Sequence, residues 1–255
     1  MARVDDAEGW RRLIASLAQW SRNIDGASAG MRTIERDGAI ATVAPAAPER
    51  AVVNDVVYWD AAGLESAYDE IAAAYDEAGI QAWTVWVPET EPGVADMLAA
   101  RGHVLDSDPE AMILDLDAVE RPPLPPGFTT DVDASTIARI NDVAYGLPGS
   151  FERALSGMRR GEDVHLYAAG DGDEPSSCLM AFDHGGDCSI WLVATLPQAR
   201  GNGLARALMG HALADGRERG CTTSTLEATD LGRPVYERLG YRSLGEIQMW
   251  EKRAA

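Results

Sequence analysis

The pattern of apolar and polar residues is clearest in the C-terminal half of the chain. An apolar run at residues 190–194 predicts a buried strand. Apolar residues at helical spacing predict a helix after it, with one face formed by Leu204, Leu208 and Ala212 beside Ala205, Met209 and Leu213. A β-branched stretch at 222–227 predicts a second strand, and residues 232–241 predict a short helix closed by Gly240. The predicted order is strand, loop, helix, strand, short helix and strand.

Weaker patterns precede these elements. Residues 128–132 predict a first strand, Ser135 is a candidate N-cap for a helix, and residues 151–158 predict a second helix. Residues 164–169 and 178–182 predict two antiparallel strands. The C-terminal half is therefore expected to be an α/β domain.

Two glycines lie in the loop between the apolar strand and its helix. Residues 198–205 are Gln-Ala-Arg-Gly-Asn-Gly-Leu-Ala. Glycines let the main chain approach a ligand closely, and the unpaired N–H groups at the start of a helix favour an anion. The loop therefore predicts a site for a diphosphate, and a simple tight turn is the alternative explanation.

Two motifs in this order resemble the GNAT superfamily of acyl-CoA-dependent N-acyltransferases. The pyrophosphate loop of that family has Gln or Arg, two residues, Gly, one residue, and Gly or Ala, which Gln198, Gly201 and Gly203 match. Its later signature is a Tyr four residues before a Gly that an aromatic residue follows, as at Tyr236 and Gly240. The resemblance covers roughly residues 126–255. It implies an α/β fold, of the α+β type, with a mixed, mostly antiparallel sheet flanked by helices.

The resemblance implies an acetyl-CoA site. Main-chain amides of the loop and first helical turn would receive the pyrophosphate, and the preceding strand would pair with the pantetheine arm. One strand N–H group would polarise the thioester carbonyl, a contact worth several kcal/mol in many transition states. The implied acetyl-CoA residues are Val193, Ala194, Thr195, Gln198, Arg200, Gly201, Asn202, Gly203, Leu204, Ala205, Arg206 and Thr229.

Two of these positions depart from the family pattern. Asn202 stands where relatives often have a basic residue, which weakens one phosphate contact. Thr229 stands where the family often has Asn, and its hydroxyl can still donate a hydrogen bond, with less reach.

Proton transfer gives a further set of candidates. By resemblance, Tyr236 would act as general acid on the leaving thiolate, although a tyrosine on a short helix is also often half-buried packing. An alkylamine is mostly protonated at pH 7, so the acceptor needs a base. Glu227, at the end of the strand beside the glycine-loop strand, is the candidate, and a solvated surface carboxylate is the alternative. Tyr145 and Phe151 are candidate substrate contacts by resemblance, with core packing as the alternative.

The first half of the chain repeats the order of elements. Residues 52–59 predict a strand, 64–78 a helix, 82–87 a strand and 97–98 part of a short helix, with a last strand near 112–114. This repetition predicts that the first half is a degenerate GNAT-like domain, in tandem with the C-terminal domain. We expect it to shape or cover the acceptor site. An unrelated α/β domain of similar pattern is the alternative.

The repeated half lacks both chemical motifs. Leu98 stands where Tyr236 stands in the other half, and residues 60–63 contain no double-glycine loop. A proline-rich run then predicts a linker. The expected domains are a degenerate domain at residues 1–118, a linker at 119–127 and a catalytic domain at 128–255.

The composition limits the classes of partner that the protein is expected to bind. The chain has 255 residues and 46% hydrophobic content, enough for a packed core. Its formal charge of −19, from 41 acidic and 22 basic residues, argues against a nucleic-acid partner. An acidic cleft attracts cationic acceptors such as polyamines or aminoglycosides, although solubility is the simpler explanation of the charge.

Further features of the sequence indicate the compartment and the metal content. No run approaches the roughly 20 apolar residues of a membrane span, and residues 1–6 are unlike a signal peptide. We therefore expect a cytoplasmic protein with no membrane partner, as a monomer or homodimer. Three cysteines without paired spacing and four scattered histidines give little support to a disulfide framework or a metal site, so we expect no metal.

The sequence thus predicts an N-acetyltransferase that transfers an acetyl group from acetyl-CoA to a primary amine, by direct attack in a ternary complex. The expected acceptor is a small-molecule amine. One alternative is a CoA-binding sensor or docking module without turnover. Another is an acetyltransferase that accepts protein N-termini or lysines, and would prefer peptides to small amines.

Overall fold

The computed structural model describes residues 3–172 and 174–254 of the chain. Met1, Ala2, Asp173 and Ala255 lie outside the described residues. The predictions for residues 1–6 and for the domain at 1–118 therefore include Met1 and Ala2, which are not described. The predicted domain at 128–255 likewise includes Asp173 and Ala255.

Helices and strands are mixed along the whole described chain. The helices are α1 (Asp6–Asn23), α2 (Ala61–Glu77), α3 (Pro92–Ala100), α4 (Ala134–Tyr145), α5 (Ser150–Leu155), α6 (Leu204–Arg219) and α7 (Arg233–Leu239), with 3₁₀ turns η1 (Ala51–Val53), η2 (Leu116–Ala118) and η3 (Pro197–Ala199). The strands are β1 (Arg32–Arg36), β2 (Ala39–Val43), β3 (Asp55–Tyr58), β4 (Ala82–Pro88), β5 (Val104–Ser107), β6 (Glu110–Asp115), β7 (Val164–Ala169), β8 (Ser177–His184), β9 (Asp187–Thr195), β10 (Thr223–Ala228) and β11 (Arg242–Arg253).

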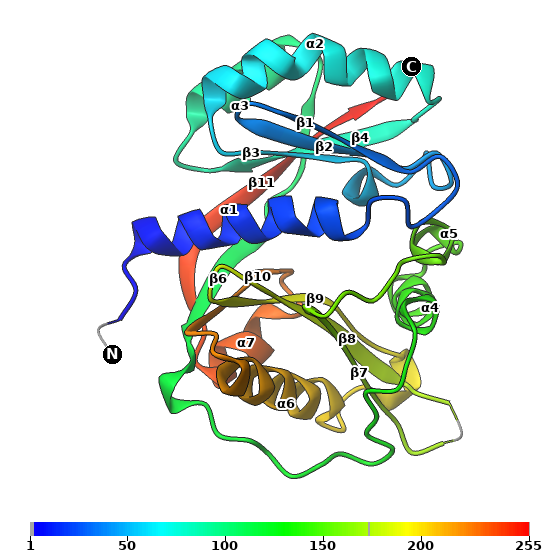
Figure 1. The fold of residues 1–255 in the computed structure, drawn as a ribbon, viewed down its shortest axis with the longest axis vertical. Coiled ribbons are helices and arrows are strands. Elements are labelled where there is room, and N and C mark those ends of the chain that lie inside the picture. The colour runs from blue at the N-terminus through cyan, green and yellow to red at the C-terminus, as the bar shows by residue number, and fades with distance from the viewer. Residues whose placement is uncertain (1–2, 173, 255) are drawn as a thin grey trace.

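One eleven-stranded sheet runs through both halves. Its order is β1-β2-β3-β4-β11-β6-β10-β9-β8-β7, and β5 pairs with β11. Only β3 with β4 and β9 with β10 are parallel among the described pairings, and each parallel pair is joined through a helix, α2 or α6. The expected fold class, a mixed and mostly antiparallel sheet flanked by helices, is confirmed, as is the repeated element order. In Figure 1, α2 covers the part of the sheet at the top and α6 and α7 the part at the bottom, with α1 between them.

Two strands interlock the halves. The first residues of β11 pair with β6, and its last residues, from Ile247 to Arg253, pair with β4. Strand β6, which precedes the predicted linker, also pairs with β10 along its whole length. The long β11 ribbon therefore crosses from the lower to the upper part of the molecule (Figure 1). The predicted domain boundary stays a prediction, and these pairings cross it.

The proline-rich run at 119–127 follows the surface of α6 without regular structure. Arg217 Nη1 donates to the carbonyl of Val119 at 2.8 Å. A Cβ on Gly210 would lie 2.7 Å from Cγ of Pro122, so glycine is needed on that helix face. The run is thus fixed against α6.

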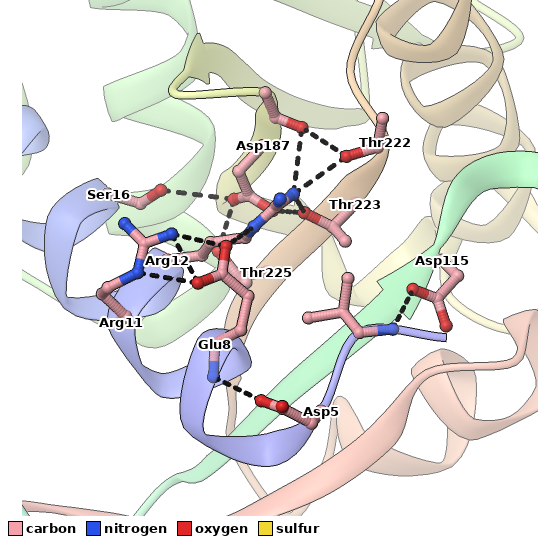
Figure 2. A network of polar contacts seen from close by, with 12 residues as sticks. Asp5, Glu8, Arg11, Arg12, Ser16, Asp115, Asp187, Thr222, Thr223 and Thr225 are labelled. Atoms are coloured by element: carbon pink, nitrogen blue, oxygen red, sulfur yellow. Dashed lines mark hydrogen bonds and ion pairs between the residues drawn. The ribbon is translucent and has the colours of Figure 1, made fainter. Parts of the chain in front are cut away.

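Helix α1 ties the two halves together through a buried carboxylate (Figure 2). Asp187, at the start of β9, accepts hydrogen bonds from Thr223 at 2.7 Å, Thr225 at 2.6 Å and Ser16 of α1 at 3.2 Å. Arg12, one turn earlier on α1, donates to Thr223 Oγ1 at 2.7 Å. Because a buried carboxylate is costly unless it is hydrogen-bonded, this network fixes α1 to the strands.

The predicted apolar face of α6 is confirmed. Leu204, Leu208, Met209, Ala212 and Leu213 are all buried. They pack in one cluster with residues of β8, β9 and β10. The periodicity therefore identified both the helix and the side that meets the sheet.

Two predictions near residue 130 are wrong. Residues 128–132 form no strand, because only Thr129 pairs, in a single bridge to β7, and the N–H of Asp131 turns back to the Thr129 hydroxyl at 3.0 Å. The N-cap of α4 is Asp133 and not Ser135, since the Asp133 side chain accepts the first-turn N–H bond. An aspartate before a helix is as good a cap as a serine, so either position was open.

Other differences concern the connections between the halves. Helix α5 ends at Leu155, before the predicted end at 158, because Gly157 N–H donates to the carbonyl of Ala27 at 2.8 Å. The sequence patterns predict no element before residue 52, yet α1, β1 and β2 form there. In the described residues no helix is long and apolar enough to cross a membrane.

Candidate active site

The loop between β9 and α6 leaves a helix N-terminus open. Gly201 and Gly203 have φ angles of +80° and +76°, a region that favours glycine. Gly203 is the N-cap of α6 and provides no capping side chain. The first helical hydrogen bond runs from Ala207 N–H to the Gly203 carbonyl, so the N–H groups of residues 204–206 bond to nothing among the described residues. These free donors, at the positive end of the helix dipole, can bind an anion.

Strand β9 contains a bulge beside this loop. Leu192 has φ +52° and is the single non-glycine residue with positive φ among the described residues. The register with β8 shifts opposite this point, as bulges require. Asn141 of α4, which is buried, donates through Nδ2 to the Leu192 carbonyl at 2.9 Å and to the Ile137 carbonyl at 2.9 Å. Asn141 therefore fixes the bulge and the direction of the amides that follow it.

Strands β9 and β10 separate towards their C-terminal ends. They pair in register at only one position, Thr223 with Asp187, where both strands begin. Beyond that point the backbone groups at the end of β9 face no neighbouring strand on this side. An extended ligand can pair with that free edge as a strand would.

A cavity of about 500 Å³, here named the loop cavity, lies along this edge. Its walls come from β9, the glycine loop, the first turn of α6 and helix α7. The lining residues are Ala144, Tyr145, Val193, Ala194, Thr195, Ala199, Arg200, Gly201, Gly203, Leu204, Ala205, Arg206, Thr229, Leu231, Gly232, Val235, Tyr236 and Arg238.

A second cavity of about 490 Å³, here named the junction cavity, lies between the two halves. Residues 49–52 and 106–109 of the first half form one side, and β9, β10 and β11 form the other. The two cavities share Tyr145, Val193, Thr229 and Tyr236. A ligand in one cavity can therefore meet a ligand in the other at these four residues.

Tyr236 on α7 is the hydroxyl at this meeting point. It is 8% exposed and packs edge-on against Tyr241, with ring centroids 5.9 Å apart. A Cβ on Gly232 would lie 2.9 Å from the Tyr236 ring, so glycine lets the ring approach the turn before α7. Burial raises the pKa of Tyr236 well above the ordinary value of a phenol. The side chain is therefore protonated at neutral pH, as a general acid must be before it acts.

Glu227 on β10 faces the junction cavity. It lies opposite Ala111 of β6 and is only partly exposed. Burial, helped by the negative charges of Asp187 and Asp55, raises the pKa of Glu227 to about 8. At neutral pH most of this group is the neutral acid, and its carboxylate form, which prevails above about pH 8, can accept a proton from an ammonium group as a general base does.

Residues 136–241 match the family model described as the acetyltransferase (GNAT) family. This match to the GNAT acetyltransferase family lies in the C-terminal half of the chain, which is named the GNAT half below. No curated protein matches the chain in sequence.

Solved structures extend the likeness of fold to both halves. A GCN5-related N-acetyltransferase from Kribbella flavida is 20% identical, with 95% of each chain covered and a TM-score of 0.66. One from Sphaerobacter thermophilus is 19% identical, covering 98% of this chain and 94% of that one, with a TM-score of 0.58. A tandem GNAT protein from the clavulanic acid biosynthesis pathway is 15% identical, covering 86% and 79%, with a TM-score of 0.56. At these identities the likeness shows the fold, which is the GNAT fold in tandem.

Most of the site residues predicted for the GNAT half come together in the structure. Of the predicted acetyl-CoA set, all but Gln198 and Asn202 line the loop cavity. The Gln198 side chain is exposed, and Asn202 Nδ2 bonds to the carbonyl of Ala199 at 3.3 Å. Glu227 and Phe151 line the junction cavity alone. The roles of these residues stay predictions.

The sequence reasoning missed several residues of the GNAT half. Leu231, Val235 and Arg238 line the loop cavity from α7 and its preceding turn. Leu231 is 73% exposed beside the cavity, and this exposure is visible only in the structure. Asn141 gave no signal, because its partner Leu192 is distant in the sequence.

Other candidate chemistry in the described residues is sparse. Cys178, Cys188 and Cys221 are buried and free. The structure contains no group of three or more His, Cys, Asp or Glu residues, among those described, that could hold a metal ion. His211 is buried, with its ring 4.7 Å from that of Phe128.

Proposed function

We propose that the GNAT half transfers an acetyl group from acetyl-CoA to a primary amine, by direct attack while both substrates are bound. The observation that supports this best is the pair of cavities that share Tyr145, Val193, Thr229 and Tyr236. A donor in one cavity and an acceptor in the other have their reacting groups side by side, which removes much of the entropic cost of a bimolecular reaction.

The loop cavity takes acetyl-CoA in this proposal. The free N–H groups of residues 204–206 bind the pyrophosphate, and the exposed Arg206 and Arg238 side chains add positive charge. The edge of β9 at residues 193–195 pairs with the pantetheine arm. Arg200 braces this edge from outside, since its guanidinium donates to the carbonyls of Thr195 at 3.2 Å and Ala144 at 2.9 Å.

The junction cavity takes the amine. Glu227 removes a proton from the ammonium group, and the free amine attacks the thioester carbonyl carbon. A β9 amide beyond the Leu192 bulge donates to the oxyanion that forms. When the carbon–sulfur bond breaks, Tyr236 gives its proton to the sulfur and regains one from the amide nitrogen. The products are the acetylated amine, CoA and the proton left on Glu227, which passes to solvent.

Thiol release from acetyl-CoA with a panel of amines tests this proposal. We expect Tyr236→Phe to lower kcat by about 100-fold or more, because the general acid is lost while the ring stays in place. Calorimetry is expected to show CoA binding by this variant close to that of the parent. Tyr58→Phe, outside both cavities, is the matched control and should keep the parent rate.

Two outcomes would contradict the proposal in different ways. Equal rates in the parent and Tyr236→Phe would remove Tyr236 from the mechanism. CoA binding without thiol release for any amine or peptide would favour the alternative of a CoA-binding sensor.

A further inference from the structure

The walls of the junction cavity are predominantly acidic. The carboxylates of Glu49, Asp106, Asp108, Glu227, Asp230 and Glu251 line it, against only two arginines among the described lining residues. Three of these carboxylates, those of Asp108, Asp230 and Glu227, form no ion pair with another described residue. A cavity with this imbalance attracts cations and repels anions.

One of the two arginines packs against an aromatic ring of the cavity wall. The Arg50 guanidinium lies over the Phe151 ring, 5.2 Å from its centroid. The other, Arg253, lies at the rim, where its side chain is 66% exposed. Arg50 also attracts Asp106 and Glu251 electrostatically, but neither arginine forms an ion pair with Asp108, Asp230 or Glu227.

Glu251 is the buried acidic group of this cavity. The residue is 3% exposed, and its Oε1 accepts no hydrogen bond from any described residue. Its counter-ion is the largely solvated Arg253, whose Nη2 lies 2.6 Å from that oxygen. Asp106 is the next acidic neighbour and is 3.9 Å from the same guanidinium. Because the contact between Glu251 and Arg253 is an ion pair to a largely solvated side chain and lacks hydrogen-bond geometry, the buried carboxylate can accept a further donor from a ligand.

Between the acidic groups the wall is aromatic. Trp86 of β4, Trp191 of β9 and Phe151 of α5 line the cavity. The Trp86 indole N–H donates to the Asp55 carboxylate at 3.0 Å, and the Trp191 indole N–H donates to the Ser189 hydroxyl at 2.8 Å. Both rings therefore present apolar surface to the cavity. Such a surface suits methylene groups and, through ring faces, ammonium groups.

The acidic groups are spaced along the cavity. Glu227 lies directly opposite Ala111, and Asp108 precedes Ala111 by three residues in the chain. Asp108 itself lies in the turn between β5 and β6, so the two carboxylates reach the cavity from different elements. Carboxylates on separate elements can each receive a different cationic group of one ligand.

Resting on the proposed function, we propose that the acceptor is a flexible di- or polycationic alkylamine. Its reacting amine lies between Glu227 and Tyr236, and its methylene chain lies along Trp86 and Trp191. Its second cationic group lies against Asp106, Asp108 and Glu251. The N-terminal half and the end of β11 therefore supply the selectivity, and the GNAT half supplies the chemistry.

Paired substrates test this proposal. Cadaverine and pentylamine have the same chain and differ in one terminal amine, and spermidine adds a third cation. We expect kcat/KM for cadaverine to exceed that for pentylamine by about ten-fold or more, because only the diamine engages the far carboxylates. Spermidine is expected to match or exceed cadaverine.

A double variant locates the preference. Asp106→Asn with Asp108→Asn is expected to reduce the ratio of kcat/KM for cadaverine to that for pentylamine to about two or less, and the ratio is the readout. Asp69→Asn with Asp96→Asn removes the same charge from the exposed surface of α2 and α3 and is the matched control. The control should keep the parent ratio, which separates contact in the cavity from the general effect of net charge.

The possible outcomes separate the proposed dicationic acceptor from the proposed acetyltransferase activity on which it rests. Turnover of both amines at equal kcat/KM, a better peptide substrate, or an unchanged ratio in the Asp106 and Asp108 variant would overturn the dicationic acceptor and leave the acetyltransferase standing. If no amine is turned over, calorimetry with CoA-saturated protein decides. Heat with cadaverine and none with pentylamine supports the proposed ligand, and no heat with either overturns it.

Discussion

Helices α2 and α6 hold equivalent places in the two halves, yet their N-termini differ. At α2, the Asp60 carboxylate caps the helix and accepts the Gly63 N–H bond at 2.7 Å. At α6, Gly203 provides no such group, and the space before it is open to at least 4 Å from a Cβ position. The first helix thus carries its own anion, and the second needs one from outside.

The backbone around α2 closes that site further. A Cβ on Gly63 would lie 2.3 Å from the carbonyl oxygen of Asp37, so the β1–β2 hairpin touches the helix start directly. Leu98, at the position of the motif tyrosine, is fully buried in the apolar core of that half. In the first half, therefore, the same frame is filled at the positions where the second half has an open helix start and Tyr236.

Among substitutions that remove the difference between the N-termini of α2 and α6, the largest effect is expected at Gly203. Gly203→Glu gives α6 a carboxylate near its N-terminus, as Asp60 gives α2, at a φ that a side chain tolerates poorly. We expect the Kd for CoA, measured by calorimetry, to rise by about 100-fold or more. Gly79→Glu is the matched control, because Gly79 has φ +68° with nothing near its Cβ position and lies outside both cavities. Unchanged CoA affinity in Gly203→Glu would refute the proposed phosphate site.

Removing Glu227 is expected to have the next largest effect. In the parent, kcat is expected to rise with pH through about 8, where the Glu227 carboxyl loses its proton. Glu227→Gln should lower kcat by about 100-fold and remove that limb, whereas Glu237→Gln, on the exposed face of α7, should not. Asp55→Asn should move the limb to lower pH, because one negative neighbour is lost. A parent profile without this limb would exclude Glu227 as the base.

The raised pKa of Glu227 also affects stability. Its folded pKa of about 8 exceeds the ordinary carboxyl value of 4.5, so the folded state binds the proton more tightly. The free energy of unfolding should therefore fall as pH rises from 4.5 to 8. Urea unfolding at several pH values should show a weaker fall in Glu227→Gln.

A smaller loss is expected when the β9 bulge loses its support. Asn141→Ala removes the side chain that holds the Leu192 carbonyl, and we expect kcat to fall by about ten-fold with CoA affinity nearly kept. Stability should fall by about 1–3 kcal/mol. Adding Leu192→Gly, which relieves the positive φ, should restore part of the rate. If kcat falls only as far as the loss of stability explains, and Leu192→Gly restores none of it, Asn141 has a structural role alone.

The smallest effect is expected at Asp60. Asp60→Ala removes a helix cap, which should lower the free energy of unfolding by about 1 kcal/mol in urea titrations. Thiol release should not change. Because the hairpin still closes the α2 N-terminus, calorimetry should show one CoA per chain, as in the parent. A second bound CoA would show that the cap alone had blocked that half.

The elements with strong periodicity could be predicted from sequence. Helix α6 and its buried face follow from apolar residues at helical spacing, and β10 and α7 follow from β-branched residues and the closing Gly240. Helix α1 had a cap at Asp5 and apolar spacing, yet no motif drew attention to it. Residues 128–132 have strand-like composition, but a strand needs a partner along its length and only Thr129 found one.

The parts of the site that depend on distant contacts could not be predicted. The glycine loop and Tyr236 are local motifs, so spacing identified them. The bulge at Leu192 depends on Asn141 of α4, and the junction cavity depends on Asp106, Asp108 and Glu251 meeting from separate strands. No local pattern encodes a meeting of this kind. The charge of the chain indicated cations, but only the structure collects the carboxylates in one place.

The crossing of β11 has a consequence for how the chain folds as it is made. Strand β4 has an open edge until β11, more than 150 positions later, is available to pair with it. Contacts that join such distant segments form late, because closing a long loop costs entropy before the contact stabilises anything. A ribosome-bound chain thus presents an apolar, unpaired strand that other chains can join. The final ribbon does more than complete a sheet: it ends the interval in which the growing chain is most prone to aggregate.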